Sequence, residues 1–365
     1  MLGEVKILRP YDGYYCSIRN ALLVVLCGSF AGLRDLKMIH QWASFPGPAS
    51  FLHDIFGIIR VPCYSWLAQI LRLVDPISLN EKFTQWISSD LNLGGKTLAV
   101  DGKTVCSTGK MSCFDRALHV VSAFVAECKI TFAQVACDEK SNEIPAVQEL
   151  LKTLDLHGCM VVADALNCQK ETAKIIREQG GDYLLSVKDN HQTMAEEIET
   201  YFADDSLRNL CDTAVTTEKN SGRFESREAF VTTDIEWFED KNDWTDLACF
   251  GAINTQFTTK NGTSNEWHFY ISSRKLTAEQ LLHHARAEWS VESMHWLLDV
   301  HFREDFCQIR DKNLQQTLNM LRKMVLNALE QYKFETKSKQ PLSRLMFEMQ
   351  HFPNKICDCL FLSPK

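Results

Sequence analysis

Two aspartates in this 365-residue chain each follow a short apolar, strand-like run. Residues 97–100 lead into Asp101, and residues 160–163 lead into Asp164. If the two strands are neighbours in one sheet, their carboxylates emerge at the same edge. A third acid, Glu292, lies in a long helical pattern from residue 277 to about 305. A helix packed across that edge would complete an all-oxygen site.

Hard divalent cations such as Mg²⁺ or Mn²⁺ prefer oxygen ligands of this kind. Two such ions can activate an attacking oxygen and stabilise a leaving one in an in-line phosphoryl displacement. A simpler interpretation competes, because an acid after a strand is often a helix cap and Asp-Gly is a common turn signal. Spacing alone does not decide between them.

The surrounding pattern predicts an α/β fold. Residues 1–95 show helical spacing, with breaks at Pro46-Gly47-Pro48, Pro62 and Asp75-Pro76. From residue 96 the pattern predicts three strands, a helix, a strand, a helix and a strand, which is the order of an RNase H-like mixed-sheet core. We therefore expect a helical N-terminal module (1–95), a catalytic domain (96–335) with a β-rich insertion at about 190–267, and a C-terminal tail (336–365).

Several ordered motifs resemble the H-repeat-associated insertion-sequence transposases, which are IS4-like DDE transposases. They are residues 97–103 (TLAVDGK), 140–144 (KSNEI), 154–158 (LDLHG), 161–169 (VVADALNCQ), 180–190 (GGDYLLSVKDN) and 289–305 (WSVESMHWLLDVHFRED). Together they cover roughly residues 95–330. The helical start, including Arg34-Asp35-Leu36, resembles the family's N-terminal associated module more loosely.

This resemblance implies a function. Asp101, Asp164 and Glu292 match the catalytic DDE triad and would hold two Mg²⁺ (or Mn²⁺) ions. The implied activity is metal-dependent cleavage and strand transfer of double-stranded DNA, at the inverted-repeat ends of a mobile element and at its target. A homodimer assembled on DNA, in the bacterial cytoplasm at the nucleoid, is the implied setting.

Six polar residues are candidates for DNA contact. Lys103 follows the first acid, Lys188 and Asn190 follow the last core strand, Arg223 and Arg227 lie in the insertion, and Arg286 precedes Glu292. For each, an ordinary surface or loop role is the competing interpretation. We expect His295 to be a satisfied structural histidine and Trp296 to be a core residue rather than a base-stacking platform.

The chain departs from the family pattern at several places. Val105-Cys106-Ser107-Thr108 replaces a basic stretch, and Asn220-Ser221-Gly222-Arg223 lacks the family's histidine. Glu288 stands where the family has histidine, and Ser293 where it has asparagine. A catalytically reduced or inactive DNA-binding relic and a stand-alone metal-dependent nuclease are therefore alternatives. A Rossmann-type enzyme is set aside, because no Gly-x-Gly-x-x-Gly follows the first strand.

Composition bears on partners and location. The formal net charge of −8 weighs against a nucleic-acid partner, although clustered carboxylates can coexist with separate basic patches. The most apolar stretch, residues 21–33, is too short to span a bilayer and predicts a buried helix. The fourteen cysteines, without a secretory signal, are typical of reduced thiols in a cytosolic protein.

Overall fold

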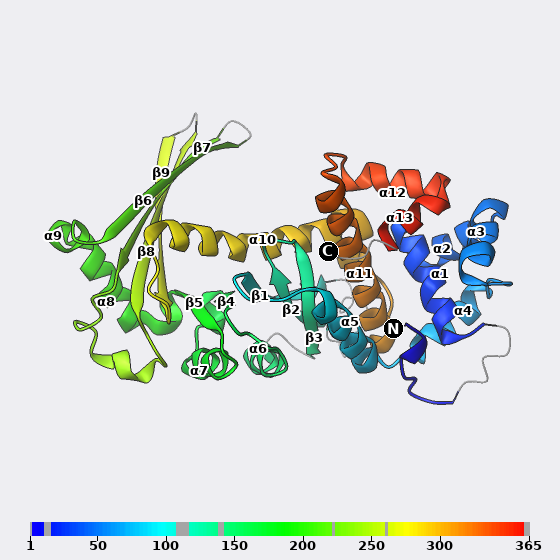
Figure 1. Ribbon diagram of the computed structural model, residues 1–365, viewed down its shortest axis with the longest axis horizontal. Coiled ribbons are helices and arrows are strands. Elements are labelled where there is room, and N and C mark those ends of the chain that lie inside the picture. Colours follow the sequence, from blue (N-terminus) through cyan, green and yellow to red (C-terminus); the bar gives the residue numbers. More distant parts are fainter. Residues whose placement is uncertain are drawn as a thin grey trace.

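One mixed sheet of nine strands runs through the centre of the molecule (Figure 1). The computed structural model describes residues 2–10, 16–106, 117–137, 142–220, 223–259 and 262–360. The strand order is β3-β2-β1-β4-β5-β9-β8-β7-β6. The strands are β1 (Thr97–Val105), β2 (Leu118–Val125), β3 (Ile130–Cys137), β4 (Met160–Ala163), β5 (Asp182–Val187), β6 (Asp212–Asn220), β7 (Arg223–Thr232), β8 (Cys249–Thr259) and β9 (Gly262–Ser272).

The first five strands form the core half of the sheet, with β1, β4 and β5 parallel and β2 and β3 antiparallel. Every residue of β2 and β4 is buried, which suits their Val- and Ala-rich sequences. The predicted α/β fold with a mixed-sheet core is confirmed.

The insertion continues the same sheet. After the helices α8 (Gln192–Ala203) and α9 (Asp205–Arg208), strands β6 to β9 form antiparallel hairpins of 9 to 11 residues per strand. The sequence predicts only short β-like runs here, because outward polar side chains interrupt the apolar pattern. Only the end of β9, Phe269 to Ser272, pairs with β5. Its earlier residues pair with β8 alone, beyond the core.

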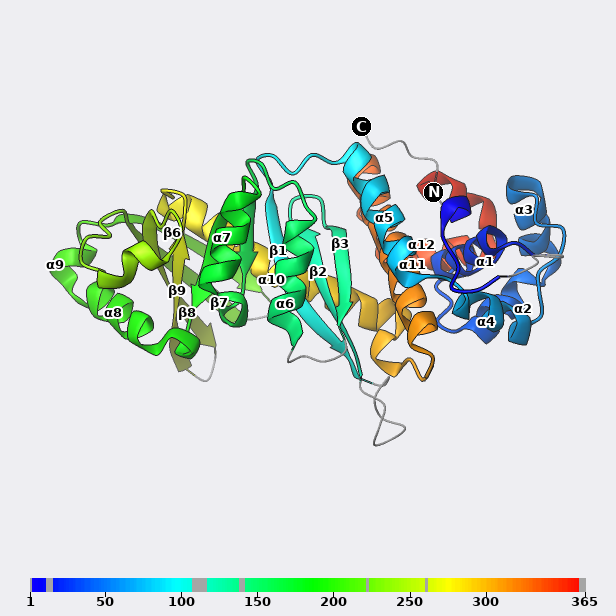
Figure 2. The same ribbon diagram turned by 90° about the horizontal axis from the view of Figure 1, so that it is seen from below.

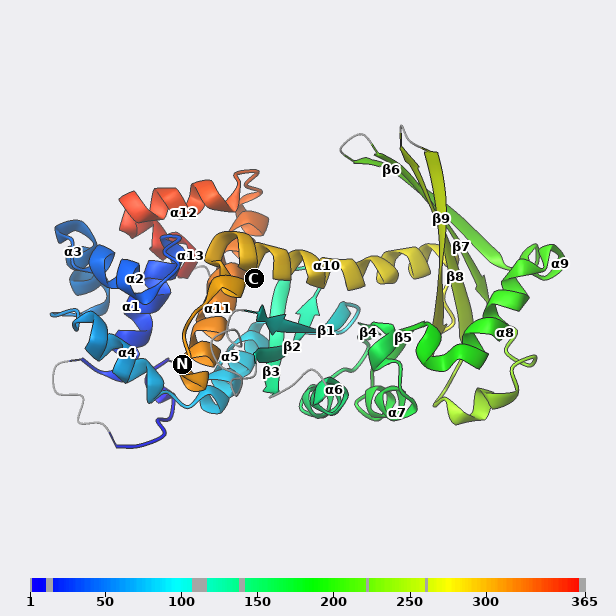
Figure 3. The same cartoon turned by 180° about the vertical axis from the view of Figure 1, so that it is seen from behind.

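Helices cover both faces of the core half. The helices α6 (Glu143–Lys152) and α7 (Lys170–Glu178) lie on one face, and the 25-residue α10 (Ala278–Phe302) crosses the other (Figures 1 and 3). A capping box between Thr277 and Gln280 starts α10. This long helix packs against β1 and β4 and also against β6 and β7, so it links the two halves of the sheet.

The described N-terminal residues form five α-helices, of which the first four lie at one end of the molecule while α5 lies beside β3 and α11 (Lys312–Thr336) (Figure 2). The five helices are α1 (Ile18–Phe30), α2 (Leu36–Ala43), α3 (Pro46–Phe56), α4 (Tyr64–Arg72) and α5 (Pro76–Asp90). The predicted break at Pro46 is instead the start of α3, because proline is favoured at the first turn of a helix. The predicted buried helix is α1, whose residues from Ala21 to Phe30 are all buried.

The last helices return to the N-terminal helices. α11 runs from the core to them, and α12 (Leu342–His351) and α13 (Ile356–Leu360) pack beside them. The Trp42 indole donates to the carbonyl of Gln350 at 3.0 Å. The segment predicted as a tail therefore carries ordered helices. In the described part of the chain, no helix is both long enough and apolar enough to cross a bilayer.

Candidate active site

Strand register brings the two aspartates together. The parallel pairing of β1 with β4 ends where Val100 meets Ala163, so Asp101 and Asp164 are the next residues on neighbouring strands. Neighbouring strands lie about 4.8 Å apart. One detail differs from expectation, because β1 does not end at Asp101. It continues to Val105, where β2 alone still pairs with it.

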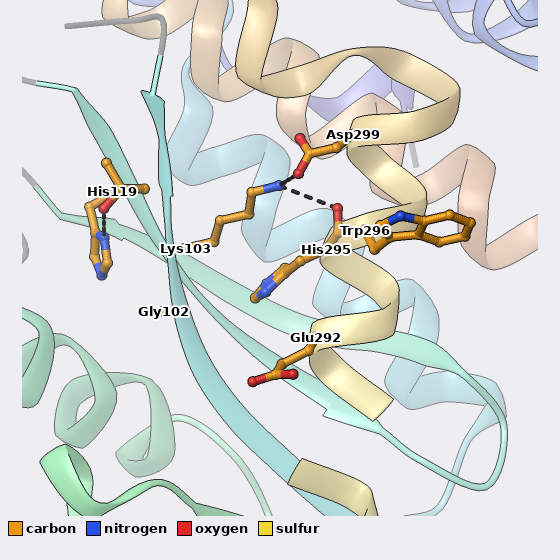
Figure 4. Close-up of a pocket in the computed structure, with 8 residues that line it drawn as sticks. Gly102, Lys103, His119, Glu292, His295, Trp296 and Asp299 are labelled. Carbon is orange, nitrogen blue, oxygen red and sulfur yellow. Dashed lines mark hydrogen bonds and ion pairs between the residues drawn. The ribbon is translucent and has the colours of Figure 1, made fainter. Parts of the chain in front are cut away.

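Glu292 reaches this edge from above. Its carboxylate points from α10 toward β1 (Figure 4), and it lines a pocket of about 380 Å³ together with Gly102, Lys103 and Trp296. The same face of α10 carries His295 and Asp299, one and two turns further on. The helix thus presents a row of polar groups to the strand that carries Asp101.

The carboxylates are close enough to repel one another. Burial raises the pKa of Asp101 to about 7, and the charges of Asp164, Glu143 and Glu292 add to this rise while the Gly102 backbone opposes it. Burial also raises the pKa of Glu288, to which Asp164 and Glu292 contribute. We call Asp101, Glu143, Asp164, Glu288 and Glu292 the acid cluster.

A buried hydrogen-bond chain supports Asp164 from behind. The Asn167 amide donates to Asp164 Oδ1 and to Glu143 Oε1, both at 3.0 Å. Glu143 Oε2 lies 2.9 Å from His119 Nε2, and His119 Nδ1 lies 2.8 Å from the Thr104 hydroxyl. Both oxygens of Glu143 are therefore engaged, and the chain ties β1, β2 and α6 to the turn after β4.

Gly102 allows this chain to approach the first aspartate. A Cβ added at Gly102 would lie 2.5 Å from Glu143 Oε2 and 2.6 Å from His119 Nε2. Any side chain at this position would displace the pair. The Asp-Gly motif is thus part of a strand with a close side-chain approach, and not the turn that the competing interpretation offers.

Two further groups on α10 border the acids. The Ser186 hydroxyl donates to Glu288 Oε2 at 3.0 Å, and His295 Nδ1 lies 3.4 Å from Asp101 Oδ2. Burial lowers the pKa of His295 to about 3, with Lys323, Lys103 and His119 adding to the effect, so the ring is neutral. Its Nε2 is buried and has no hydrogen-bond partner among the described residues, which contradicts the expectation of a satisfied histidine.

The donor set fits a hard cation. Asp101, Asp164 and Glu292 offer only oxygen atoms, and their mutual repulsion is the condition that a bound divalent ion would relieve. Within the described ranges, no three His, Cys, Asp or Glu side chains are placed so that they could hold a metal ion as they stand. The acids are therefore gathered without being closed around an ion.

Of the predicted DNA-contact residues near the acids, two are held by protein groups. The Lys103 ammonium lies 2.5 Å from Asp299 Oδ2 (Figure 4) and 3.9 Å from Glu304 Oε2. Asn190 donates to the carbonyl of Ala165. Lys188 is exposed and close enough to Glu288 to lower its pKa. Lys188 is therefore the best placed of the three to meet a phosphate.

The insertion arginines are tied to glutamates. Arg227 is buried, forms ion pairs with Glu225 and Glu218, and its guanidinium lies 4.5 Å from the centre of the Trp289 ring. Arg286 pairs with Glu218 at 2.5 Å. We call Glu218, Glu225, Arg227 and Arg286 the arginine cluster. The prediction of a phosphate contact by Arg227 finds no support in this buried position, where Glu225 of the same strand, Glu218 of β6 and Trp289 of α10 contact the guanidinium.

Among the other predictions, one is wrong and several fall on residues that the structure does not describe. Trp296 is 61% exposed, which corrects its assignment to the core. Arg223 begins β7, but its side chain is outside the described residues, as are Ser107, Thr108, Ser221 and Gly222. Sequence reasoning missed the roles of His119, Glu143 and Asn167. The only signal was that the motifs KSNEI and VVADALNCQ contain the last two.

The chain is similar to known transposases. The model of the family described as "Transposase DDE domain" matches residues 93–328. The candidate H repeat-associated transposase YhhI of Escherichia coli (strain K12) is 33% identical over 323 residues, covering 86% of this chain and 84% of that protein. Protein YbfL of the same strain is 33% identical over 74% of this chain and 73% of its own length. The candidate transposase YncI of Escherichia coli O157:H7 is 32% identical over 75% and 72%.

Proposed function

The chain belongs to the family of transposases with a DDE domain, and from that premise we propose that it cuts DNA at the ends of a mobile element and joins them to target DNA. In this proposal Asp101, Asp164 and Glu292 are the catalytic acids. The single observation that carries it is the register of β1 and β4, which sets the two aspartates side by side beneath the helix that bears Glu292.

Two divalent ions, Mg²⁺ or Mn²⁺, would be held by these three carboxylates and would supply activation of the attacking oxygen and stabilisation of the leaving one. Water attacks the phosphodiester at the element end and leaves a 3′-hydroxyl. That hydroxyl then attacks a phosphodiester of the target, forming the new bond as the target strand breaks.

The protein's own groups prepare the site. Asn167 fixes Asp164 through Oδ1, no described residue donates a hydrogen bond to Oδ2, and Glu143 anchors Asn167. The neutral His295 beside Asp101 brings no positive charge that would compete for that carboxylate. These contacts orient the acids before substrate arrives, which lowers the reorganisation needed during the reaction.

The test is cleavage of duplexes that carry the element's terminal repeats, with Mg²⁺, by wild type and Glu292→Gln. We expect cleavage by the variant to fall at least about a hundredfold. Glu279→Gln, at an exposed position near the start of the same helix, is the matched control and should cleave normally. Equal cleavage by wild type and Glu292→Gln refutes the assignment of Glu292.

A test of DNA strand joining distinguishes a transposase from a stand-alone nuclease. A supercoiled plasmid added to the cleaved ends should acquire them covalently, and cleavage without joined products would identify a nuclease instead. No cleavage by wild type, with DNA binding retained, would identify an inactive relic. We further propose that two copies act together on the two ends, in the bacterial cytoplasm where that DNA lies.

A further inference from the structure

A large basic cleft lies where the N-terminal helices meet the end of α10 and the start of α11. It has a volume of about 1030 Å³. Its lining includes residues from the α1–α2 loop, α2, α4, the segment after α10, and α11. Six cationic side chains line it: Arg34, Lys37, Arg72, Arg303, Arg310 and Arg322.

These cations are poorly neutralised by the protein. Among the described residues, only Arg72 of the six has a carboxylate within 4 Å, and that contact, to Asp311, is 3.9 Å long. The two acids of the lining serve helix ends instead. Asp35 accepts from the amide of Met38 at 2.8 Å, and Asp311 accepts from that of Leu314 at 2.9 Å.

One of these six cationic side chains is buried. Arg322 is 6% exposed, and its guanidinium donates to the backbone carbonyl of Arg34 at 3.0 Å. A buried guanidinium without a carboxylate partner is unfavourable unless an anion arrives from the open side. In a chain with a net charge of −8, this concentration of unpaired positive charge points to an anionic partner.

The position of the cleft indicates which anion. Arg303 follows Glu292 by eleven residues along α10, which is about 16 Å along the helix axis. That length corresponds to about five base pairs of duplex DNA. The cleft also exposes the aromatic rings of Tyr64 and Phe306. Its distance from the acids suits a continuous duplex, which can reach both places at once, better than a small anion.

We infer that this cleft binds the phosphate backbone of the duplex next to the cut, about five base pairs from the acids. The inference rests on the proposed function and adds to it the surface that grips DNA. It also accounts for Arg34-Asp35-Leu36, since Arg34 lines the cleft and donates to the carbonyl of His301 near the end of α10. The binding is to phosphates and therefore depends steeply on salt.

The test measures binding without metal. A fluorescein-labelled 30-base-pair DNA duplex of arbitrary sequence is titrated in EDTA, by anisotropy, at several NaCl concentrations. The cleft variant is Lys37→Glu with Arg310→Glu, at two exposed positions. The control, Lys152→Glu with Lys275→Glu, makes the same charge change at exposed positions near the opposite edge of the sheet, where β4 and β5 begin. Melting curves check that both variants fold.

We expect the cleft variant to bind at least tenfold more weakly, and its slope of log K against log salt to be shallower by about 1.8. The control should stay within twofold of wild type. Binding by the cleft variant that equals the control, or wild-type binding to an RNA duplex in preference to DNA, overturns the inference.

The two proposals fail separately. Glu292→Gln should bind the duplex in EDTA as wild type does, because the cleft is intact. If wild type binds through the cleft but never cleaves, the proposed function is wrong and the cleft stands. If the cleft variant still cleaves and binds normally, the cleft is wrong and the proposed function stands.

Discussion

The acid cluster and the arginine cluster lie along neighbouring turns of α10, which contributes residues to both, yet their charges are arranged in opposite ways. In the acid cluster, carboxylates gather and repel, so that the pKa of Asp101 rises to about 7. In the arginine cluster, each guanidinium meets a glutamate, and a hydrogen bond from Arg286 lowers the pKa of Glu218. The first arrangement is unbalanced and the second is neutral.

This difference indicates that the acid cluster serves the reaction and the arginine cluster stabilises the fold. Balanced ion pairs between strands and a helix stabilise the packing of α10 on the insertion. Carboxylates gathered in one place repel one another and destabilise the folded protein. Such a group is therefore expected at a functional site, where a bound cation offsets the repulsion. Substitutions in the two clusters should therefore change the stability of the folded protein in opposite directions.

The largest effect should come from Arg227→Ala. It removes one ion-pair partner of the buried Glu225 and empties the space against Trp289. Breaking a buried ion pair typically destabilises by about 3–5 kcal/mol. Urea denaturation should show that loss, while Mg²⁺ binding by the acid cluster stays intact. A loss below about 1 kcal/mol would show that the arginine cluster is not a structural support.

The opposite sign is expected for Asp101→Asn. Because burial raises the pKa of Asp101 to about 7, the folded metal-free protein binds this proton more tightly than the unfolded chain does. Its stability is therefore lost as pH rises from about 4 to about 7. The variant should remove this loss and be more stable than wild type by about 2–4 kcal/mol at pH 8 in EDTA.

Denaturation at a series of pH values measures both. Added Mg²⁺ should stabilise wild type at pH 8 and have little effect on the variant. Asp246→Asn, at an exposed position in the insertion half, is the matched control and should follow the wild-type pH profile. If Asp101→Asn destabilises the metal-free protein, the acid cluster is not a repulsive one and the comparison fails.

Gly102→Ala tests the support behind the acids. The added Cβ would overlap Glu143 and His119, which should destabilise the protein by about 1–3 kcal/mol. Gly47→Ala is the control, because nothing lies within 4 Å of its added Cβ. The melting temperature of the control should be unchanged or higher. Equal melting temperatures for both variants would show that the pair can move aside freely.

The sequence predicts those structural features that depend on neighbouring residues, and it does not predict those that depend on contacts between distant segments. Asp101 and Asp164 are predictable, because each follows an apolar run and the register then aligns them. The extension of β1 past Asp101 is not, since it depends on β2 pairing up to Leu118. The hydrogen-bond chain from Thr104 through His119 and Glu143 to Asn167 is not predictable either, because its members come from four segments that meet only in the folded protein.

The contacts of the arginines in the insertion are also only partly predictable from the sequence. A basic residue in sequence reads equally well as a DNA contact or as half of an ion pair. Glu225 and Arg227 are two apart on one strand and share a face, which is a local signal for pairing. Glu218 arrives from β6 and Trp289 from α10, and neither partner is visible from the neighbourhood of Arg227.

Of these substitutions, Arg286→Ala should change the stability of the protein least. Its pair with Glu218 is at the surface, with the Arg286 side chain 46% exposed, so its loss should destabilise by less than about 1 kcal/mol. Arg227 still contacts Glu218 at 3.5 Å, so the cluster keeps a partner for that glutamate. Duplex binding in EDTA should stay within twofold of wild type. If the variant melts normally but binds DNA tenfold more weakly, Arg286 leaves Glu218 for a phosphate when DNA is present. The arginine cluster would then be a DNA contact held in reserve, and the division between chemistry and support along α10 would be wrong at this residue.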